Sequence, residues 1–172
     1  YEISKQSHTP KEKITREVFK LWLEHGKHPQ DESYEYIVVP GTTKEKISSG
    51  FNGRNLVILS NTPEVQAVKH TGLNIIQAAF YEAGEIKVSS DITIEMDNAG
   101  LLMIQTNGRS IEQISVSDPS RKLEKLHFSV TSKLNKTGDQ FSVLWNEAES
   151  MSEISVDLPQ DEYAGKSVTI EL

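Results

Sequence analysis

Hydrophobic and polar positions alternate in short runs along most of this chain, and the clearest example is NTPEVQAVKHTGLNIIQAAFYEAG, residues 61–84. Two apolar runs rich in β-branched and aromatic residues meet at Thr71-Gly72. Turn-forming residues bound them at Thr62-Pro63 and at Gly84. This pattern predicts a β-hairpin lying in a sheet.

The same pattern repeats on both sides of the hairpin. LVIL precedes it, and the turns that follow include Asp97-Asn98-Ala99-Gly100 and Asn107-Gly108. Asn107-Gly108 is a strong hairpin signal, because both of its residues accept positive φ. The spacing of roughly ten residues favours an all-β, antiparallel β-sandwich. The predicted strands are 56–59, 86–88, 92–96, 101–106, 111–117, 123–132, 140–145, 154–158 and 167–172.

The first 55 residues differ from the rest. ITREVFKLWLE, residues 14–24, fits both a helix face and strand alternation, and its β-branched and aromatic content favours a strand. Residues 34–39 alternate and end at Pro40-Gly41, which predicts a second strand. Thr42 or Thr43 can cap one short helix before Gly50. Two strands alone cannot bury a face, so this region needs partner strands.

A domain boundary is expected between Gly41 and Asn55. The boundary separates two regions with strand-forming patterns, and the division that we predict is 1–55 for the first region and 56–172 for the β-sandwich. The chain begins at Tyr1 without Met, which favours a fragment of a longer protein.

Charge and composition narrow the possible functions. The 172 residues carry 25 acidic and 18 basic side chains, a formal net charge of -7. This balance disfavours nucleic acid or an anionic membrane as a partner, because a phosphate lattice would repel the average surface. Cysteine is absent, which excludes disulfides and thiolate metal sites.

Residues able to carry chemistry are scattered. His25 and His28 flank Asp31-Glu32 and have metal-ligating side chains, but a loop with this composition is more typical of solvent-facing histidines. His70 and His127 fit half-buried strand positions. The acidic pairs Glu147/Glu149 and Asp161/Glu162 fit solvated turns, and Ser110, Ser115 and Ser117 lack the sequence of a nucleophile elbow. We therefore expect no catalytic residue, metal or cofactor in this chain.

Arg121, Lys122 and Lys125 form the most basic local patch and are the candidate substrate-binding residues. A patch at the rim of a sandwich can contact an acidic sugar, whereas the commoner interpretation is an exposed turn with a charged edge strand. The aromatic residues can supply a sugar-stacking platform, although at strand spacing most of them are expected to pack in the core or on a sheet. They are Trp22, Tyr34, Tyr36, Phe80, Tyr81, Phe128 and Trp145.

Three blocks of sequence resemble polysaccharide lyase family 8, which includes chondroitin AC, hyaluronate and xanthan lyases. LWLEHGKHPQDESYEYIVVP resembles a segment of the family's central β domain. LSNTPEVQAVKH with QAAFYEAG resembles the start of its C-terminal β-sandwich. ISVSDPSRKLEKLHFSV resembles its Asp-Pro-Thr-type turn, with Ser120 where Thr is common. Before LLMI the family often has a Pro-Cys type approach, and we interpret Asn98-Ala99-Gly100 as turn variation.

The resemblance implies a secreted or periplasmic enzyme that cleaves uronate-containing polysaccharide by β-elimination. It also implies that the catalytic Tyr, His, Asn and Arg belong to an N-terminal α/α toroid, so none is transferred to this sequence. Residues 1–55 would be the last strands of the central β-supersandwich, and 56–172 the C-terminal β-sandwich. The implied partners are the toroid and central domain of the same chain, with acidic polysaccharide bound through the parent enzyme.

Two other classes of function remain open. A free-standing carbohydrate-binding module needs an exposed aromatic row or a basic cleft. A purely structural or interaction domain predicts instead an exposed apolar surface near residues 14–39.

Overall fold

The structure is a computed structural model that describes residues 13, 15–50 and 53–172. The chain separates into two units, residues 1–39 and residues 40–172.

The second unit contains all of the helices and strands in the described residues. One short helix precedes eleven strands, and a single 3-10 turn lies before the last strand. The elements are α1 (Lys44–Gly50), β1 (Leu56–Asn61), β2 (Val65–His70), β3 (Ile75–Phe80), β4 (Gly84–Lys87), β5 (Thr93–Met96), β6 (Gly100–Thr106), β7 (Ile111–Ser117), β8 (Lys125–Val130), β9 (Phe141–Asn146), β10 (Met151–Asp157), η1 (Asp161–Tyr163) and β11 (Val168–Glu171).

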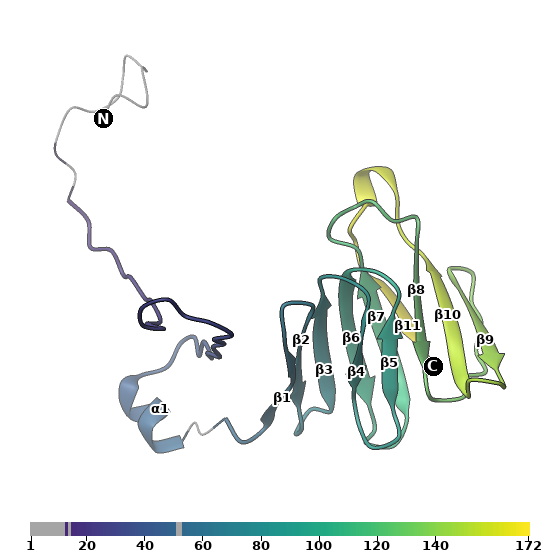
Figure 1. The fold of residues 1–172 in the computed structure, drawn as a ribbon, viewed down its shortest axis with the longest axis horizontal. Helices are drawn as coiled ribbons and strands as arrows, with labels where there is room; N and C mark the ends of the chain where they lie inside the picture. The colour runs from purple at the N-terminus through teal and green to yellow at the C-terminus, as the bar shows by residue number, and fades with distance from the viewer. Residues whose placement is uncertain (1–12, 14, 51–52) are drawn as a thin grey trace, which may run out of the picture. The chain divides into compact units, whose positions relative to one another are not determined.

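The strands form two antiparallel sheets that face each other (Figure 1). Sheet A has six strands in the order β1-β2-β3-β6-β7-β11, and sheet B has five in the order β4-β5-β8-β10-β9. The predicted all-β sandwich with one short helix is confirmed.

The core lies between the two sheets and follows from strand alternation. Every second residue of a strand points to the same face, so apolar residues at alternate positions meet in the middle. Ile76 and Ile104 of sheet A and Ile94 and Val130 of sheet B are fully buried. Burial of the apolar side chains stabilises the fold by about 25 cal/mol per Å² removed from water.

The hairpin predicted over residues 61–84 is present as β2 and β3. Its register pairs Val65 with Phe80 and His70 with Ile75. In the turn, the Leu73 N–H donates a hydrogen bond of 3.0 Å to the imidazole Nδ1 of His70. His70 is half-buried, as predicted, and holds the turn.

The β6–β7 hairpin is confirmed, but its turn differs from the predicted one. Positive φ is predicted for both Asn107 and Gly108, but only Gly108 has it, at 94°. Asn107 acts through its side chain instead, since its Oδ1 accepts from the N–H groups of Arg109 (3.1 Å) and Ser110 (3.0 Å). The side-chain amide thus takes the place of a second left-handed residue.

Gly100 occupies a constrained position, although the sequence indicated a variable turn around it. It is the first residue of β6 and is buried. A Cβ on Gly100 would lie 2.9 Å from Leu126 Cδ1 and 3.3 Å from the Ser117 carbonyl oxygen. Glycine is favoured there because a larger residue would press on the Leu126 side chain of β8 and on the backbone of β7.

The helix predicted after residue 42 is confirmed as α1. The Thr43 carbonyl accepts from the Ile47 N–H at 3.1 Å, and the Thr43 hydroxyl lies 3.4 Å from the Lys46 N–H. Hydrogen bonds from its own backbone N–H and from the Thr43 side chain lower the pKa of Glu45.

The two strands predicted over residues 14–24 and 34–39 are wrong for the described part of the first unit. Residues 15–39 form no strand or helix, and Ile14 lies outside the described residues. A strand is held by hydrogen bonds to a neighbour, and these two segments do not pair with each other. Their apolar side chains are left in solvent, with Phe19 88% and Trp22 73% exposed.

Candidate functional sites

The loop between β7 and β8 carries two of the three predicted sugar-contacting residues. Asp118 opens this loop and is buried. Its Oδ1 accepts from the Ser120 N–H at 2.8 Å, and its Oδ2 accepts from the N–H groups of Lys122 (2.7 Å) and Leu123 (2.9 Å). One carboxylate therefore fixes the backbone on which Arg121 and Lys122 stand.

These hydrogen bonds favour the ionised form of Asp118. Burial would raise the pKa, but hydrogen bonds from the Ser120 side chain and from the N–H groups of Leu123, Lys122 and Ser120 outweigh it. The pKa of Asp118 is lowered from 3.8 to about 2. The carboxylate is therefore charged at neutral pH.

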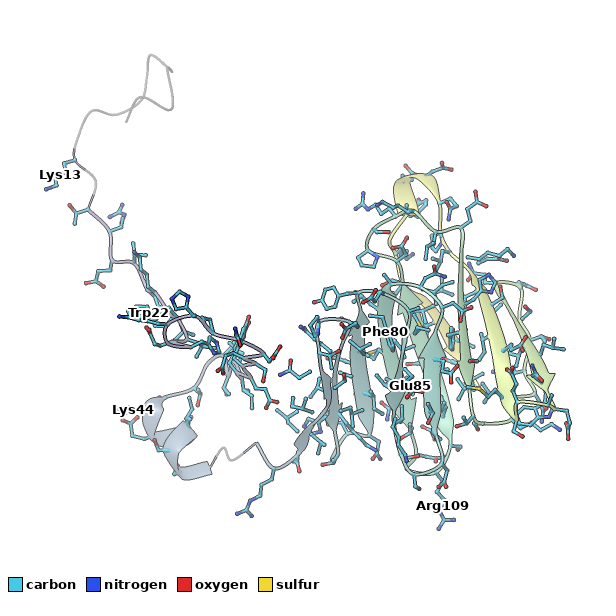
Figure 2. The ribbon with its side chains drawn as sticks, in the orientation of Figure 1. Lys13, Trp22, Lys44, Phe80, Glu85 and Arg109 are labelled. Carbon is cyan, nitrogen blue, oxygen red and sulfur yellow. The ribbon has the colours of Figure 1, made fainter. Side chains whose placement is uncertain are left out.

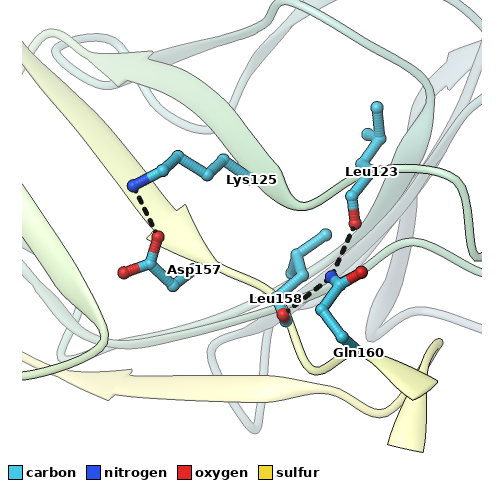
Figure 3. A network of polar contacts seen from close by, with 5 residues as sticks. All are labelled: Leu123, Lys125, Asp157, Leu158 and Gln160. Carbon is cyan, nitrogen blue, oxygen red and sulfur yellow. Dashed lines mark hydrogen bonds and ion pairs between the residues drawn. The ribbon is translucent and has the colours of Figure 1, made fainter.

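Arg121, Lys122 and Lys125 do not form one patch of free cations. Lys125 is on β8, and its Nζ lies 2.6 Å from Asp157 Oδ1 on β10 (Figure 3). Next to this ion pair, the Gln160 side chain donates to the carbonyls of Leu123 (3.1 Å) and Leu158 (2.9 Å). The charge of Lys125 is thus balanced, while Arg121 and Lys122 remain exposed in the loop as predicted candidates.

The alternative interpretation, an exposed turn with a charged edge strand, is confirmed for the turn and wrong for the strand. Strand β8 lies between β5 and β10, so it is a central strand of sheet B. The edges of the two sheets are β1 and β11 in sheet A and β4 and β9 in sheet B.

The histidines in the described part of the chain do not assemble a metal site. His25 Nδ1 lies 3.7 Å from Glu32 Oε2, and the His25 ring is 6.2 Å from that of Tyr34. Within the described residues, no three His, Asp or Glu side chains come together as metal ligands. His127 is exposed on β8 rather than half-buried as predicted.

The aromatic residues separate into two groups, which corrects the prediction that most of them pack in the core or on a sheet. Phe80 and Phe128 are buried between the sheets, and Trp145 is half-buried. Figure 2 shows Phe80 inside the sandwich and Trp22 in the first unit. The four exposed residues are Trp22 (73%), Tyr34 (59%), Tyr36 (67%) and Tyr81 (60%).

The two sheets have different outer faces. Register and alternation assign one outward row of sheet A to Val68, Gln77, Met103 and Ser115, which lie opposite one another across β2, β3, β6 and β7. Apart from Glu112, at the register shift where β7 begins, the outward residues of these four strands include no Asp, Glu, Lys or Arg. They are Gln66, Val68, His70, Ile75, Gln77, Ala79, Leu101, Met103, Gln105, Gln113 and Ser115, and we call them the uncharged face.

The outer face of sheet B is charged. Glu85 on β4 lies directly opposite Glu95 on β5, and Lys125 pairs with Asp157 across β8 and β10. A quarter of the residues in the whole chain are charged, so charged side chains would be expected on any surface that extends across four strands. Their near absence from the outward positions of β2, β3, β6 and β7 therefore distinguishes sheet A from sheet B. Sequence inspection could have found it by separating the inward and outward positions of the predicted strands.

A pocket of about 490 Å³ lies at one end of the sandwich. It is formed by the β6–β7 turn, the loop after β8 and the end of β11. Its lining was missed at the sequence level because the residues come from three separate segments. They are Ser110, Ile111, Ser132, Lys133, Leu134, Asn135, Lys136 and Leu172, and we call this the end pocket.

This fold and these surfaces define an antiparallel β-sandwich module with one uncharged outer face. Residues 57–127 match the C-terminal beta-sandwich domain of polysaccharide lyase family 8, and residues 1–50 match the family's super-sandwich domain. The chain belongs to polysaccharide lyase family 8.

The relatives of this chain include the enzymes that the sequence resembles. The chain is 34% identical over 162 residues to chondroitinase-AC of Pedobacter heparinus, covering 94% of this chain and 21% of the relative. It is 32% identical to hyaluronate lyase of Thermasporomyces composti, over 64% of this chain and 14% of that enzyme. The chain therefore spans about a fifth or less of the length of these relatives.

Solved structures share the fold. A chondroitinase AC lyase studied with oligosaccharides superposes with a TM-score of 0.56 at 27% identity, over 75% of this chain and 17% of that one. A Paenibacillus xanthan lyase superposes with a TM-score of 0.58 at 20% identity, over 78% of this chain and 13% of that one.

None of the helices in the described part of this chain has the length and hydropathy to cross a bilayer.

Proposed function

We propose that this chain is a non-catalytic part of a family 8 polysaccharide lyase that cleaves uronate-containing polysaccharide, of the chondroitin or hyaluronan type, by β-elimination. Residues 1–55 would complete the central supersandwich, and residues 56–172 would be the C-terminal β-sandwich. The parent enzyme would act outside the cell or in the periplasm. The two family matches, in this order along the chain, support this division.

The uncharged face is the observation that carries the structural role. Leu101 and Met103, both on β6, are 43% and 36% exposed on this face. A contiguous apolar and amide surface without charge is typical of a protein interface, since charged residues are depleted in interface cores. We infer that this face packs on another domain of the parent lyase.

The first unit supports the same interpretation. Phe19, Leu21 and Trp22 are each more than 70% exposed, although their sequence has strand-forming composition. Large apolar side chains gain free energy when a partner removes them from water. The partner that we propose is the remainder of the supersandwich, which would also supply the missing strand neighbours.

A substitution on each sheet tests the packing role. Leu101→Lys places a cation on the uncharged face, and Leu144→Lys makes the same change on β9 of sheet B, where Leu144 is 66% exposed. In the 172-residue chain both should change the free energy of unfolding by less than about 0.5 kcal/mol. In the full-length lyase, Leu101→Lys should destabilise by about 2 kcal/mol or more, because it buries an unpaired charge.

Thermal unfolding of the four variants, each beside its unsubstituted parent, measures this difference. A full-length lyase that tolerates Leu101→Lys as well as Leu144→Lys would remove the proposed role of the uncharged face.

A further inference from the structure

The end pocket lies at the opposite end of the sandwich from Arg121 and Lys122. Strand β7 starts at Ile111, beside the pocket, and ends at Ser117, beside the Asp118 loop. Figure 2 shows Arg109 of the β6–β7 turn at the end where the pocket lies. Any ligand in the pocket therefore belongs to a site separate from the basic loop predicted from the sequence.

Two cations line the pocket in a chain whose net charge is -7. Lys133 and Lys136 both stand on the loop after β8 and are exposed. In the part of the chain that the structure describes, neither has an acidic partner within ion-pair distance. The Lys133 ammonium lies 5.1 Å from the centre of the Trp145 ring, which orients it without neutralising it.

A fully buried hydroxyl fixes the loop that carries these lysines. Ser152 on β10 is 0% exposed. Its Oγ accepts from the Leu134 N–H at 2.9 Å and donates to the Ser132 carbonyl at 2.8 Å. Both bonds hold the backbone on either side of Lys133, so this part of the pocket wall is ordered before a ligand arrives.

The opposite wall is held in a similar way. The Asn107 side chain accepts from the Ser110 N–H at 3.0 Å and donates from Nδ2 to the Ser110 hydroxyl at 2.9 Å. Preformed walls reduce the entropy lost on binding.

The remaining lining defines the kind of ligand. Ile111, Leu134 and Leu172 supply apolar surface, while Ser110, Ser132 and Asn135 supply hydroxyl and amide groups. Cations beside an apolar floor with neutral hydrogen-bonding groups match a ring that carries both hydroxyls and an anionic group. A bare inorganic anion would use the lysines alone.

We propose that the end pocket binds an acidic saccharide, with a carboxylate or sulfate group near Lys133 and Lys136 and a sugar ring against Leu134 and Leu172, which are half-buried. The choice of a saccharide rests on the proposed function, whereas the anionic group follows from the pocket. Because both lysines are exposed, the expected dissociation constant is about 1 mM, and it rises with salt.

Amide NMR titration of the 172-residue chain tests the proposal. The ligands are a chondroitin tetrasaccharide, a neutral maltotetraose and sodium sulfate, compared at equal ionic strength. We expect saturating shifts at residues 110–111 and 132–136 with the acidic tetrasaccharide, and binding at least five-fold weaker for the other two ligands.

Paired substitutions locate the site. Lys133→Gln with Lys136→Gln should weaken binding of the tetrasaccharide at least five-fold, while the charge-matched control Lys44→Gln with Lys46→Gln, at exposed positions of α1, should leave it unchanged. The proposal would be overturned if sulfate caused equal shifts, or if the tetrasaccharide shifted residues 119–123 instead. It would also be overturned if no shift occurred at about 10 mM ligand. None of these results bears on the packing role, which the Leu101→Lys comparison tests separately.

Discussion

At the scale of single residues, the buried carboxylate of Asp118 fixes the backbone of the loop between β7 and β8. Its carboxylate is buried and accepts three backbone hydrogen bonds from the loop that follows it. An N–H group left without an acceptor in this position would cost about 1 to 3 kcal/mol. The Asp-Pro-Ser sequence thus serves to shape the β7–β8 connection.

Asp118→Asn should lower the free energy of unfolding by about 1 to 3 kcal/mol, because the amide nitrogen cannot accept the hydrogen bonds made to the second oxygen. Chemical denaturation at pH 7 measures the loss. Asp97→Asn, at an exposed position, is the matched control and should be close to neutral.

The same carboxylate makes stability depend on pH. Its pKa is about 2 in the folded chain against 3.8 as the ordinary value, so its contribution is complete above pH 4 and is lost as the pH falls towards 2. We expect a loss of about 1 to 2 kcal/mol over that window after allowing for solvent screening. Asp118→Asn should flatten this part of the stability profile, and an unchanged slope would exclude Asp118 as its source.

The sequence indicated the residue types of this loop but not their roles. Arg121, Lys122 and Lys125 are close enough in sequence to look like one patch, yet only the fold brings Asp157 to Lys125. The partner comes from β10, far along the chain. A local pattern cannot predict a charge balance that depends on strand order.

At the scale of elements, Gly100 lies where β6 passes close to β7 in its own sheet and to side chains of sheet B. Its missing side chain makes room for Leu126 and Met96, and the Ser117 carbonyl oxygen lies 3.3 Å from the place of a Cβ. Gly72, in the β2–β3 turn, has no contact closer than 3.4 Å around the place of a Cβ.

Gly100→Ala should therefore destabilise the chain by about 1 to 3 kcal/mol through overpacking. Gly72→Ala should be neutral or stabilise by up to about 1 kcal/mol, since alanine reduces the freedom of the unfolded chain. Urea denaturation of both variants compares them side by side. Equal effects would mean that the space around Gly100 relaxes without cost.

Strand existence was predictable because alternation and turn residues are local signals. The β2–β3 hairpin and the strands from Leu56 to Glu171 follow from them. The segments around Trp22 and Tyr36 carry the same signals but form no strand, because pairing depends on a neighbour that the pattern does not contain.

At the scale of the whole sandwich, sheet B has a charged outer face, whereas strands β2, β3, β6 and β7 of sheet A present the uncharged face. Composition alone gave a net charge of -7 and could not assign it to one face. Register does so, because Glu85 and Glu95 lie on sheet B while Gln77 and Met103 lie on sheet A. The end pocket also depends on tertiary structure, since its walls come from three distant segments.

Above all, we propose that this chain serves a polysaccharide lyase without performing the elimination itself. The decisive experiment is incubation with chondroitin, hyaluronan and xanthan, followed by ultraviolet absorbance of the unsaturated product. Chondroitinase-AC of Pedobacter heparinus is the positive control for chondroitin. We expect no rise in absorbance from the 172-residue chain with any of the three polymers, whereas saturable turnover of any one of them would refute the proposal.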